Sequence, residues 1–175
     1  MNSRLKKTTA TAMLAAMTCV ATMIIKVPTL GTNGYVNIGD ALVLISAWIM
    51  GNPYGALAAG IGSALADILS GYASYAPATA IIKYAMAFFC ALISTSMIRN
   101  NSKRFLAHII GSIVAEVIMI AGYFAYESTV LGYGLAASAS IVSNAVQGGV
   151  CIVLGNALIQ VLLRIPAIAA LKDPA

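Results

Sequence analysis

The stretch FLAHIIGSIVAEVIMIAGYFAY occupies residues 105–126 and contains a single acidic or basic residue, Glu116. A helix needs about 20 mostly apolar residues to cross the hydrocarbon core of a bilayer, so this stretch is long enough to span it. The whole chain has the same character, with 61% hydrophobic and 9% charged residues among 175. Soluble domains carry about 25% charged residues. The sequence therefore predicts an all-α integral membrane protein.

Five further apolar segments share this character, so we expect six transmembrane helices in one membrane domain of residues 1–175. The predicted spans are 8–25, 40–51, 54–71, 78–98, 105–126 and 138–163. The basic start of the first span also fits a signal peptide, but no small-x-small cleavage site precedes Lys26 and Pro28, so we expect it to be retained. These spans leave no room for a soluble catalytic domain.

Basic residues between the spans predict the orientation. With an even number of spans both termini share one side, and that side carries eight basic residues: Arg4, Lys6, Lys7, Arg99, Lys103, Arg104, Arg164 and Lys172. In the loops of the other side only Lys26 is basic. The positive-inside rule therefore places both termini in the cytoplasm. The net charge of +5 is explained by topology, and we expect no nucleic-acid partner.

Ionisable residues inside the predicted spans mark a candidate site, because each costs roughly 2.5–3.5 kcal/mol to insert. Asp40, Asp67 and Lys83 fall in the outer half of the bundle and Glu116 near the middle. Asn144 and Gln147 share one helical face of the last span. Polar groups gathered at one depth favour a binding cup open to the outside. The outer segment with its predicted turn Gly31 to Gly34 is a candidate lid.

Each of these residues also has a structural interpretation. Asp40 fits a helix N-cap, and Asp67 with Lys83 fits a structural ion pair. Glu116 fits neutralisation by protonation or by a neighbouring helix, and Asn144 and Gln147 fit hydrogen bonds between helices. The predicted substrate-binding set is Asn33, Tyr35, Asn37, Asp40, Tyr75, Lys83, Tyr84, Glu116, Tyr123, Asn144 and Gln147.

The cysteines and the single histidine give no indication of a catalytic or metal site. Cys19, Cys90 and Cys151 lie in apolar runs and are expected to be buried free thiols, and His108 is expected at the interface beside the basic loop. We predict no catalytic residue, cofactor or metal site. Ala12 and Ala16 form a small-xxx-small stripe that allows another helix to approach closely, either within the chain or from a partner.

Four stretches carry a resemblance to a known family: YVNIGDA (35–41), MGNPYGA (50–56), GSALADILSGY (62–72) and YAPATAIIK (75–83). With the six spans and the stripe, the chain resembles the substrate-binding S component of an energy-coupling factor (ECF) vitamin transporter. It is most similar to the riboflavin/hydroxymethylpyrimidine-type branch. The matched stretches cover residues 35–83, and the predicted topology covers the rest.

The resemblance implies partners: a membrane coupling subunit (T component) and two ATP-binding-cassette ATPases, in the plasma membrane of a bacterial cell. It also implies that Ala12 and Ala16 face the coupling subunit, and that the protein topples to carry hydroxymethylpyrimidine, pyridoxine, riboflavin or a similar vitamin-like ligand inward. The chain itself has no phosphate-binding loop for ATP. The alternatives are a self-sufficient secondary transporter of a small polar solute, and a membrane enzyme or scaffold that uses Asp67, Lys83 and Glu116 for proton chemistry.

Overall fold

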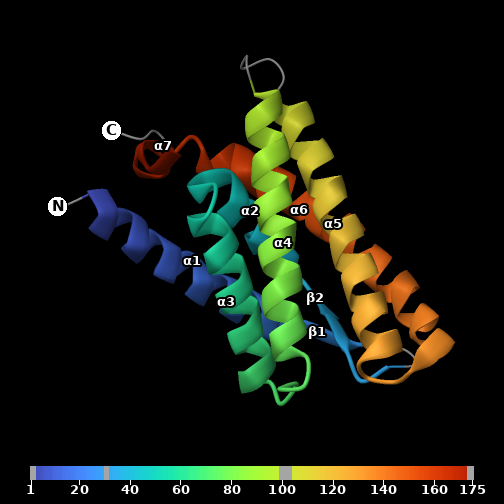
Figure 1. Cartoon of the computed structure of the whole chain (residues 1–175). Coiled ribbons are helices and arrows are strands. Elements are labelled where there is room, and N and C mark those ends of the chain that lie inside the picture. Colours follow the sequence, from blue (N-terminus) through green and yellow to red (C-terminus); the bar gives the residue numbers. More distant parts are fainter. Residues whose placement is uncertain (1–2, 30–31, 99–103, 173–175) are drawn as a thin grey trace.

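A computed structural model describes residues 3–29, 32–98 and 104–172 and shows a helical bundle (Figure 1). Its helices are α1 (Ser3–Ile24), α2 (Gly39–Met50), α3 (Tyr54–Leu69), α4 (Ala76–Met97), α5 (Arg104–Thr129), α6 (Ser138–Leu162) and α7 (Pro166–Lys172). Between α1 and α2, β1 (Lys26–Pro28) and β2 (Tyr35–Asn37) pair antiparallel, and the 3-10 helix η2 (Gly134–Ala137) precedes α6. The expectation of an all-α protein is confirmed, with this short hairpin added.

Within the described residues, four helices are long and apolar enough to cross a membrane: α1, α4, α5 and α6. The two shorter apolar helices, α2 and α3, have 12 and 16 residues. At 1.5 Å per residue they extend about 18 and 24 Å, less than the roughly 30 Å of a hydrocarbon core. The largest difference from a predicted boundary is at α1, which begins at Ser3, five residues before position 8, and α5 continues three residues beyond 126 to Thr129.

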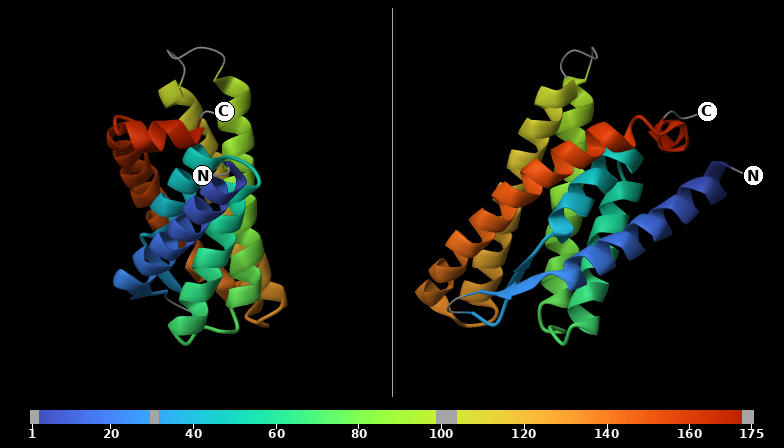
Figure 2. Two further views of the ribbon diagram at one scale, coloured as in Figure 1. Left: turned by 90° about the vertical axis from the view of Figure 1, so that its left-hand side faces the viewer. Right: turned by 180° about the vertical axis from the view of Figure 1, so that it is seen from behind.

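The bundle has two distinct ends. Figures 1 and 2 show the start of α1 and helix α7 toward the same end as the last turn of α4 and the first turn of α5, whereas β1, β2 and the α3–α4 and α5–α6 connections lie at the other. We call them the terminal end and the hairpin end. Arg4, Lys6, Lys7 and Arg104 begin helices at the terminal end, and Lys26 lies on β1. Gly31, Arg99 and Lys103, used in the predictions above, lie outside the described residues.

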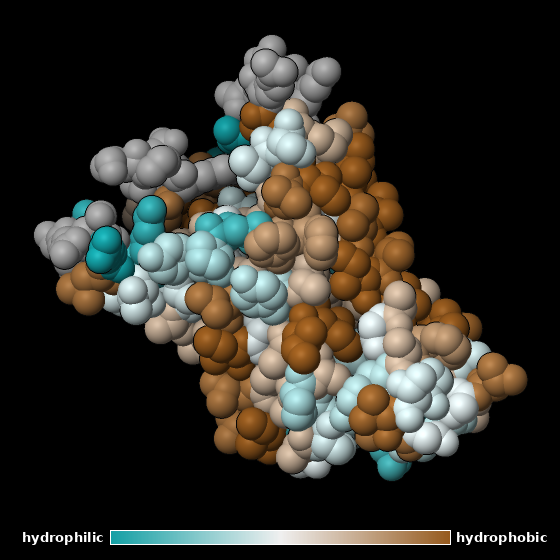
Figure 3. All heavy atoms as spheres, viewed as in Figure 1, coloured by the Kyte–Doolittle hydropathy of each residue, from teal (hydrophilic) through white to brown (hydrophobic). Residues whose placement is uncertain are grey.

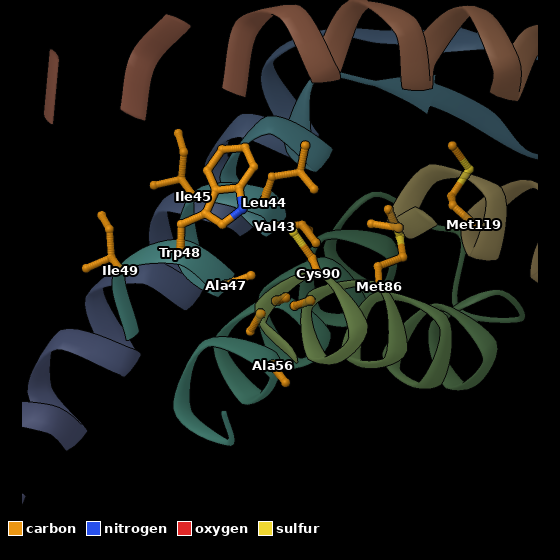
Figure 4. Close-up of a cluster of buried hydrophobic side chains, with 14 of the residues drawn as sticks. Val43, Leu44, Ile45, Ala47, Trp48, Ile49, Ala56, Met86, Cys90 and Met119 are labelled. Carbon is orange, nitrogen blue, oxygen red and sulfur yellow. The ribbon is translucent and has the colours of Figure 1, made fainter. Parts of the chain in front are cut away.

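Helix α2 forms the centre of the bundle because it is apolar on all sides. Its residues Val43, Leu44 and Ile45 are at most 1% exposed, and Trp48 is 3% exposed. It packs against α1, α3, α4 and α6, and its side chains meet Met86, Cys90 and Met119 in the core (Figure 4). A helix that is hydrophobic all round is a buried helix. The outer helices α4 and α5 expose apolar side chains instead, as the brown surface in Figure 3 shows.

Glycines allow the helices to approach closely around this centre. A Cβ atom on Gly55 would lie 2.3 Å from the carbonyl oxygen of Ser46, and one on Gly62 would lie 2.3 Å from that of Ala15. Both distances are shorter than any allowed contact, so α2 and α1 can pack on α3 only because these positions lack a side chain. The small residues of α3 therefore serve packing within the chain.

The three cysteines are free and buried, as predicted. The interfacial position expected for His108 is wrong, because this residue is fully buried. Its ring stacks on Trp48, with ring centroids 4.6 Å apart. His108 was expected beside the basic loop because it lies early in the span. It lies one helical turn after the start of α5, and its side chain points toward α2.

The α1–α3 contact yields a stability prediction. We expect Gly62→Ala to push α1 away from α3 and to destabilise the protein by about 1–3 kcal/mol, since the added methyl overpacks a backbone contact. Thermal unfolding in detergent measures the change. Gly149→Ala on α6 is the matched control, because no atom lies within 4 Å of the added Cβ. Equal melting temperatures for the two variants would contradict the close contact.

Candidate substrate-binding site

A polar cup lies at the hairpin end, between the β1–β2 segment and α3 to α6. Its lining residues are Thr29, Gly34, Tyr35, Asn37, Asp67, Tyr75, Thr79, Tyr123, Glu127, Asn144 and Gln147. The space between these side chains is about 20 Å³. A cavity needs about 10–15 Å³ to hold one water, so the cup has room for about one water molecule.

The hairpin closes the cup from above. Lys26 pairs with Asn37 and Pro28 with Tyr35, which places Tyr35 and Asn37 over the helices. The backbone N–H of Thr29 donates to the Gly34 carbonyl at 3.1 Å and holds the two chains of the hairpin together. The N–H of Asn37 donates to Oε1 of Gln147 at 2.6 Å, which ties the hairpin to α6.

Asp67 forms one wall of the cup. The hydroxyl of Tyr35 donates to its Oδ1 at 2.6 Å, and Tyr35 packs on Tyr72 with ring centroids 4.6 Å apart. Burial, together with the bond to Asp67, raises the pKa of Tyr35 well above its usual value. Tyr35 therefore stays a hydrogen-bond donor. The other oxygen of Asp67, Oδ2, accepts no hydrogen bond from the described residues.

Glu127 forms the opposite wall and was not predicted. It is 2% exposed, and it accepts hydrogen bonds from the hydroxyls of Tyr75 at 3.0 Å and of Ser140. Burial is the main reason that the pKa of Tyr75 is raised, and Glu127 adds to it. The predicted span stopped one residue before Glu127. Its spacing from Glu116 and Tyr123, eleven and four residues, puts all three on one helical face, and this signal would have found it.

Beneath the cup, charged groups form a buried floor. Lys83 on α4 donates to Oδ1 of Asp40 on α2, and Nε2 of Gln147 donates to Oδ2 of the same carboxylate. Among the described residues this is the ion pair that the structure shows. The predicted pair of Lys83 with Asp67 is therefore wrong, because Lys83 reaches α2 and Asp67 faces the hairpin. Asp40 is also not an N-cap, since α2 is preceded by Ile38 and lacks a side-chain cap.

Glu116 completes this floor. It is 3% exposed and interacts electrostatically with Asp40 and Lys83. Gly148 gives it room, since a Cβ there would lie 3.1 Å from Oε2 of Glu116. Neither oxygen of Glu116 has a hydrogen-bond partner among the described residues.

The structure brings together six of the predicted substrate-binding residues in the cup lining: Tyr35, Asn37, Tyr75, Tyr123, Asn144 and Gln147. Asp40, Lys83 and Glu116 lie in the floor instead. Tyr84 packs against Phe88 and borders the outer α3–α4 groove, and Asn33 is exposed at the rim of the hairpin, so neither lines the cup. The sequence missed Thr29, Gly34, Thr79 and Glu127.

The cup can bind a ligand by hydrogen bonds and ring contacts. Asn144 is 5% exposed and makes no hydrogen bond to another described residue, so its amide is available to a ligand. In the ranges that the structure describes, no group of three or more His, Cys, Asp or Glu side chains is arranged to hold a metal ion.

The stripe on α1 lies on an exposed face. Ala12 and Ala16 are exposed together with Met13 and Met17, which are 62% and 53% exposed. The opposite face, with Leu14 and Ala15, packs against Ala58 of α3. Ala15, rather than Ala12 or Ala16, therefore packs against the rest of the chain.

Comparisons with known proteins place this geometry in a family. A family model described as "ECF-type riboflavin transporter, S component" matches residues 2–172. A Pyrococcus woesei protein described as an uncharacterized protein in the gap 3′ region is 32% identical over 145 residues, which cover 83% of this chain and 93% of that protein.

A solved structure has the same fold. It is described as "Structure and mechanism of the S component of a bacterial ECF transporter", and it matches with a TM-score of 0.66 and 18% identity over 92% of this chain and 97% of that one. The resemblance stated from the sequence is thereby confirmed, and the protein is a membrane transport component rather than an enzyme. The chain belongs to the family of S components of ECF-type riboflavin transporters.

Proposed function

We propose that this S component binds a small water-soluble vitamin or vitamin precursor in the cup and delivers it for import. The class includes hydroxymethylpyrimidine, pyridoxine and riboflavin. The observation that carries the proposal is the cup itself: hydroxyl, amide and carboxylate groups enclosed at the hairpin end of an otherwise apolar bundle. Buried polar groups and tyrosine rings suit a flat ring with several donors and acceptors.

The hairpin acts as the lid of this site. Four of the lining residues, Thr29, Gly34, Tyr35 and Asn37, belong to the β1–β2 segment, and the closed cup of about 20 Å³ is too small for any vitamin. Ligand entry therefore requires the hairpin to move away from α6. The bond between Asn37 and Gln147 is the contact that opening must break.

The energy for import comes from partners: the ECF coupling subunit and two ATP-binding-cassette ATPases. We place α1 to α6 in the cell membrane with the terminal end in the cytoplasm, because basic residues gather there. The exposed face with Ala12 and Ala16 contacts the coupling subunit. On ATP-driven coupling the protein topples in the membrane and carries the cup inward.

The first test of the cup concerns Asn144. We expect Asn144→Ala to weaken binding of the cognate vitamin about 5- to 150-fold, because losing one hydrogen bond to a buried ligand costs about 1–3 kcal/mol. Mass spectrometry of the small molecule that copurifies identifies the ligand, and calorimetry with riboflavin, pyridoxine and hydroxymethylpyrimidine measures its affinity. Val146→Ala, on the exposed side of α6, is the control and should bind normally. Unchanged affinity in Asn144→Ala would remove Asn144 from the site.

A second test concerns coupling. We expect Ala12→Leu combined with Ala16→Leu to abolish uptake by cells while ligand affinity stays within about twofold, since bulk on this face blocks helix approach and α1 contributes no residue to the cup lining. Ala121 and Ala125 are also exposed and four residues apart on α5, so the same double substitution there is a matched control that should transport normally. Uptake that survives the α1 substitutions would show that this face meets lipid.

A third test asks whether Lys83 and Asp40 in the floor form a structural ion pair. We expect Lys83→Met to destabilise the protein by about 3–5 kcal/mol, because it leaves Asp40 buried without its cation. Thermal unfolding without ligand measures the loss, and adding Asp40→Asn should restore part of it in a double-mutant cycle. Additive losses would mean that the two residues do not form a pair.

A further inference from the structure

A second cavity lies at the terminal end of the bundle, and we call it the terminal cavity. Its volume is about 330 Å³, which falls in the range of small-molecule pockets, roughly 300–1,000 Å³. Helices α1, α2, α4, α5 and α7 each contribute to its wall, and it shares no lining residue with the cup. Figures 1 and 2 show α7 and the start of α1 beside the end of α2 that leads into α3. The cavity is therefore independent of the site proposed for the vitamin.

Lys7 reaches this cavity from the packed face of α1. Arg4 and Lys6 nearby on the same helix are exposed, whereas Lys7 is half-buried and belongs to the cavity wall. Seven residues separate Lys7 from Leu14, which packs against Ala58 of α3. Residues seven apart share a helical face, so Lys7 lies on the side of α1 that faces the bundle.

No carboxylate neutralises Lys7 in the part of the chain that the structure describes. Its ammonium makes no hydrogen bond or ion pair with a described residue. The described acids, Asp40, Asp67, Glu116 and Glu127, belong to the cup or its floor and not to this wall. The C-terminal ends of α2 and α4 lie at the cavity and favour a cation, but their partial charges do not replace a counter-ion. A half-buried ammonium in this setting favours an anionic ligand.

The rest of the wall suits a ligand that is polar at one end only. Thr95 offers an exposed hydroxyl, and Trp48 and His108 add stacked rings whose centroids are 4.6 Å apart. The apolar side of the wall contains Met50, Ile98 and Leu171. A free phosphate ion would contact the ammonium of Lys7 and leave the apolar side without a partner, whereas a phospholipid contacts both.

We propose that the terminal cavity binds the headgroup of an acidic phospholipid, with its phosphate on Lys7 and its glycerol backbone and first acyl carbons against the apolar side. The terminal end is the proposed cytoplasmic end, and the cytoplasmic leaflet carries anionic lipids. Basic pockets between transmembrane helices on that side bind acidic headgroups. The lipid contacts α1, α2 and α7 together, so it holds the start of α1 against the bundle.

Native mass spectrometry of the full chain in a neutral detergent tests the preference for charge. The protein is titrated with phosphatidylglycerol and with phosphatidylcholine of identical acyl chains. We expect phosphatidylglycerol to bind about tenfold more tightly, because the choline ammonium neutralises its own phosphate and is repelled by Lys7. Equal affinity for the two lipids would overturn the proposal.

Variants show whether Lys7 causes the preference. We expect Lys7→Gln to reduce it to within about twofold, and Lys7→Arg, which keeps the charge, to retain it. Lys6→Gln is the matched control, because it removes the same charge from an exposed position one residue away. Thermal unfolding without added lipid shows that each variant is folded. Equal losses in Lys7→Gln and Lys6→Gln mean a diffuse attraction to the basic end, and they contradict a site in the cavity.

Inorganic phosphate distinguishes a lipid from a soluble anion. We expect millimolar phosphate to leave bound phosphatidylglycerol in place, since the free ion gains nothing from the apolar side of the wall. Complete displacement of the lipid by phosphate would assign the cavity to a soluble phosphate group and reject the phospholipid.

Discussion

The buried pair of Lys83 and Asp40 is the interaction on which the site depends. Charged groups are costly in a bilayer, so this pair persists only where α2 and α4 come close and Gln147 of α6 supplies a further donor. Gln147 also accepts a hydrogen bond from the backbone N–H of Asn37, so the same side chain contacts both the ion pair and the hairpin. The shortness of α2 follows the same geometry: Asp40 starts the helix below the hairpin, and the space above its N-terminus is occupied by the cup.

Helix α1 has one face that packs against the bundle and one face that is exposed. Ala15 lies against Gly62 of α3 at a distance that tolerates no side chain, which fixes α1 to the bundle. Ala12 and Ala16 point away from it, with methionines beside them. A rigid helix with a smooth exposed face suits a partner that binds from the membrane, because small residues allow backbones to approach. Helix α1 contributes no residue to the lining of the cup, so the two surfaces share no side chain.

The sequence predicted the helices well because apolar length and turn residues are local signals. It also predicted six of the lining residues, and for Tyr123, Asn144 and Gln147 the signal was a polar side chain inside an apolar span. It failed on pairings: Asp67 was predicted as the partner of Lys83 and Asp40 as an N-cap, whereas the packing of α2 against α4 pairs Lys83 with Asp40. Glu127 was missed because its span was ended one residue too early, and Thr29 and Gly34 because a three-residue strand pair leaves no periodic signal. His108 was misplaced for a similar reason, since the direction of a side chain depends on which neighbour the helix meets.

The proposed lid and the acidic wall of the cup are linked through Tyr35 and Asp67. Tyr35 belongs to the hairpin, and its hydroxyl donates a hydrogen bond to Oδ1 of Asp67. In the proposed opening of the hairpin Asp67 loses this donor, and a buried acceptor left without a partner costs about 1–3 kcal/mol. A ligand that brings its own donor offsets that cost, whereas a ligand without one does not. Glu127 keeps its donors from Tyr75 and Ser140, which come from α4 and α6 rather than from the hairpin. The proposed opening therefore leaves two acceptors without their hairpin donors, Oδ1 of Asp67 and Oε1 of Gln147, and these are the acceptors that a ligand in the cup would meet.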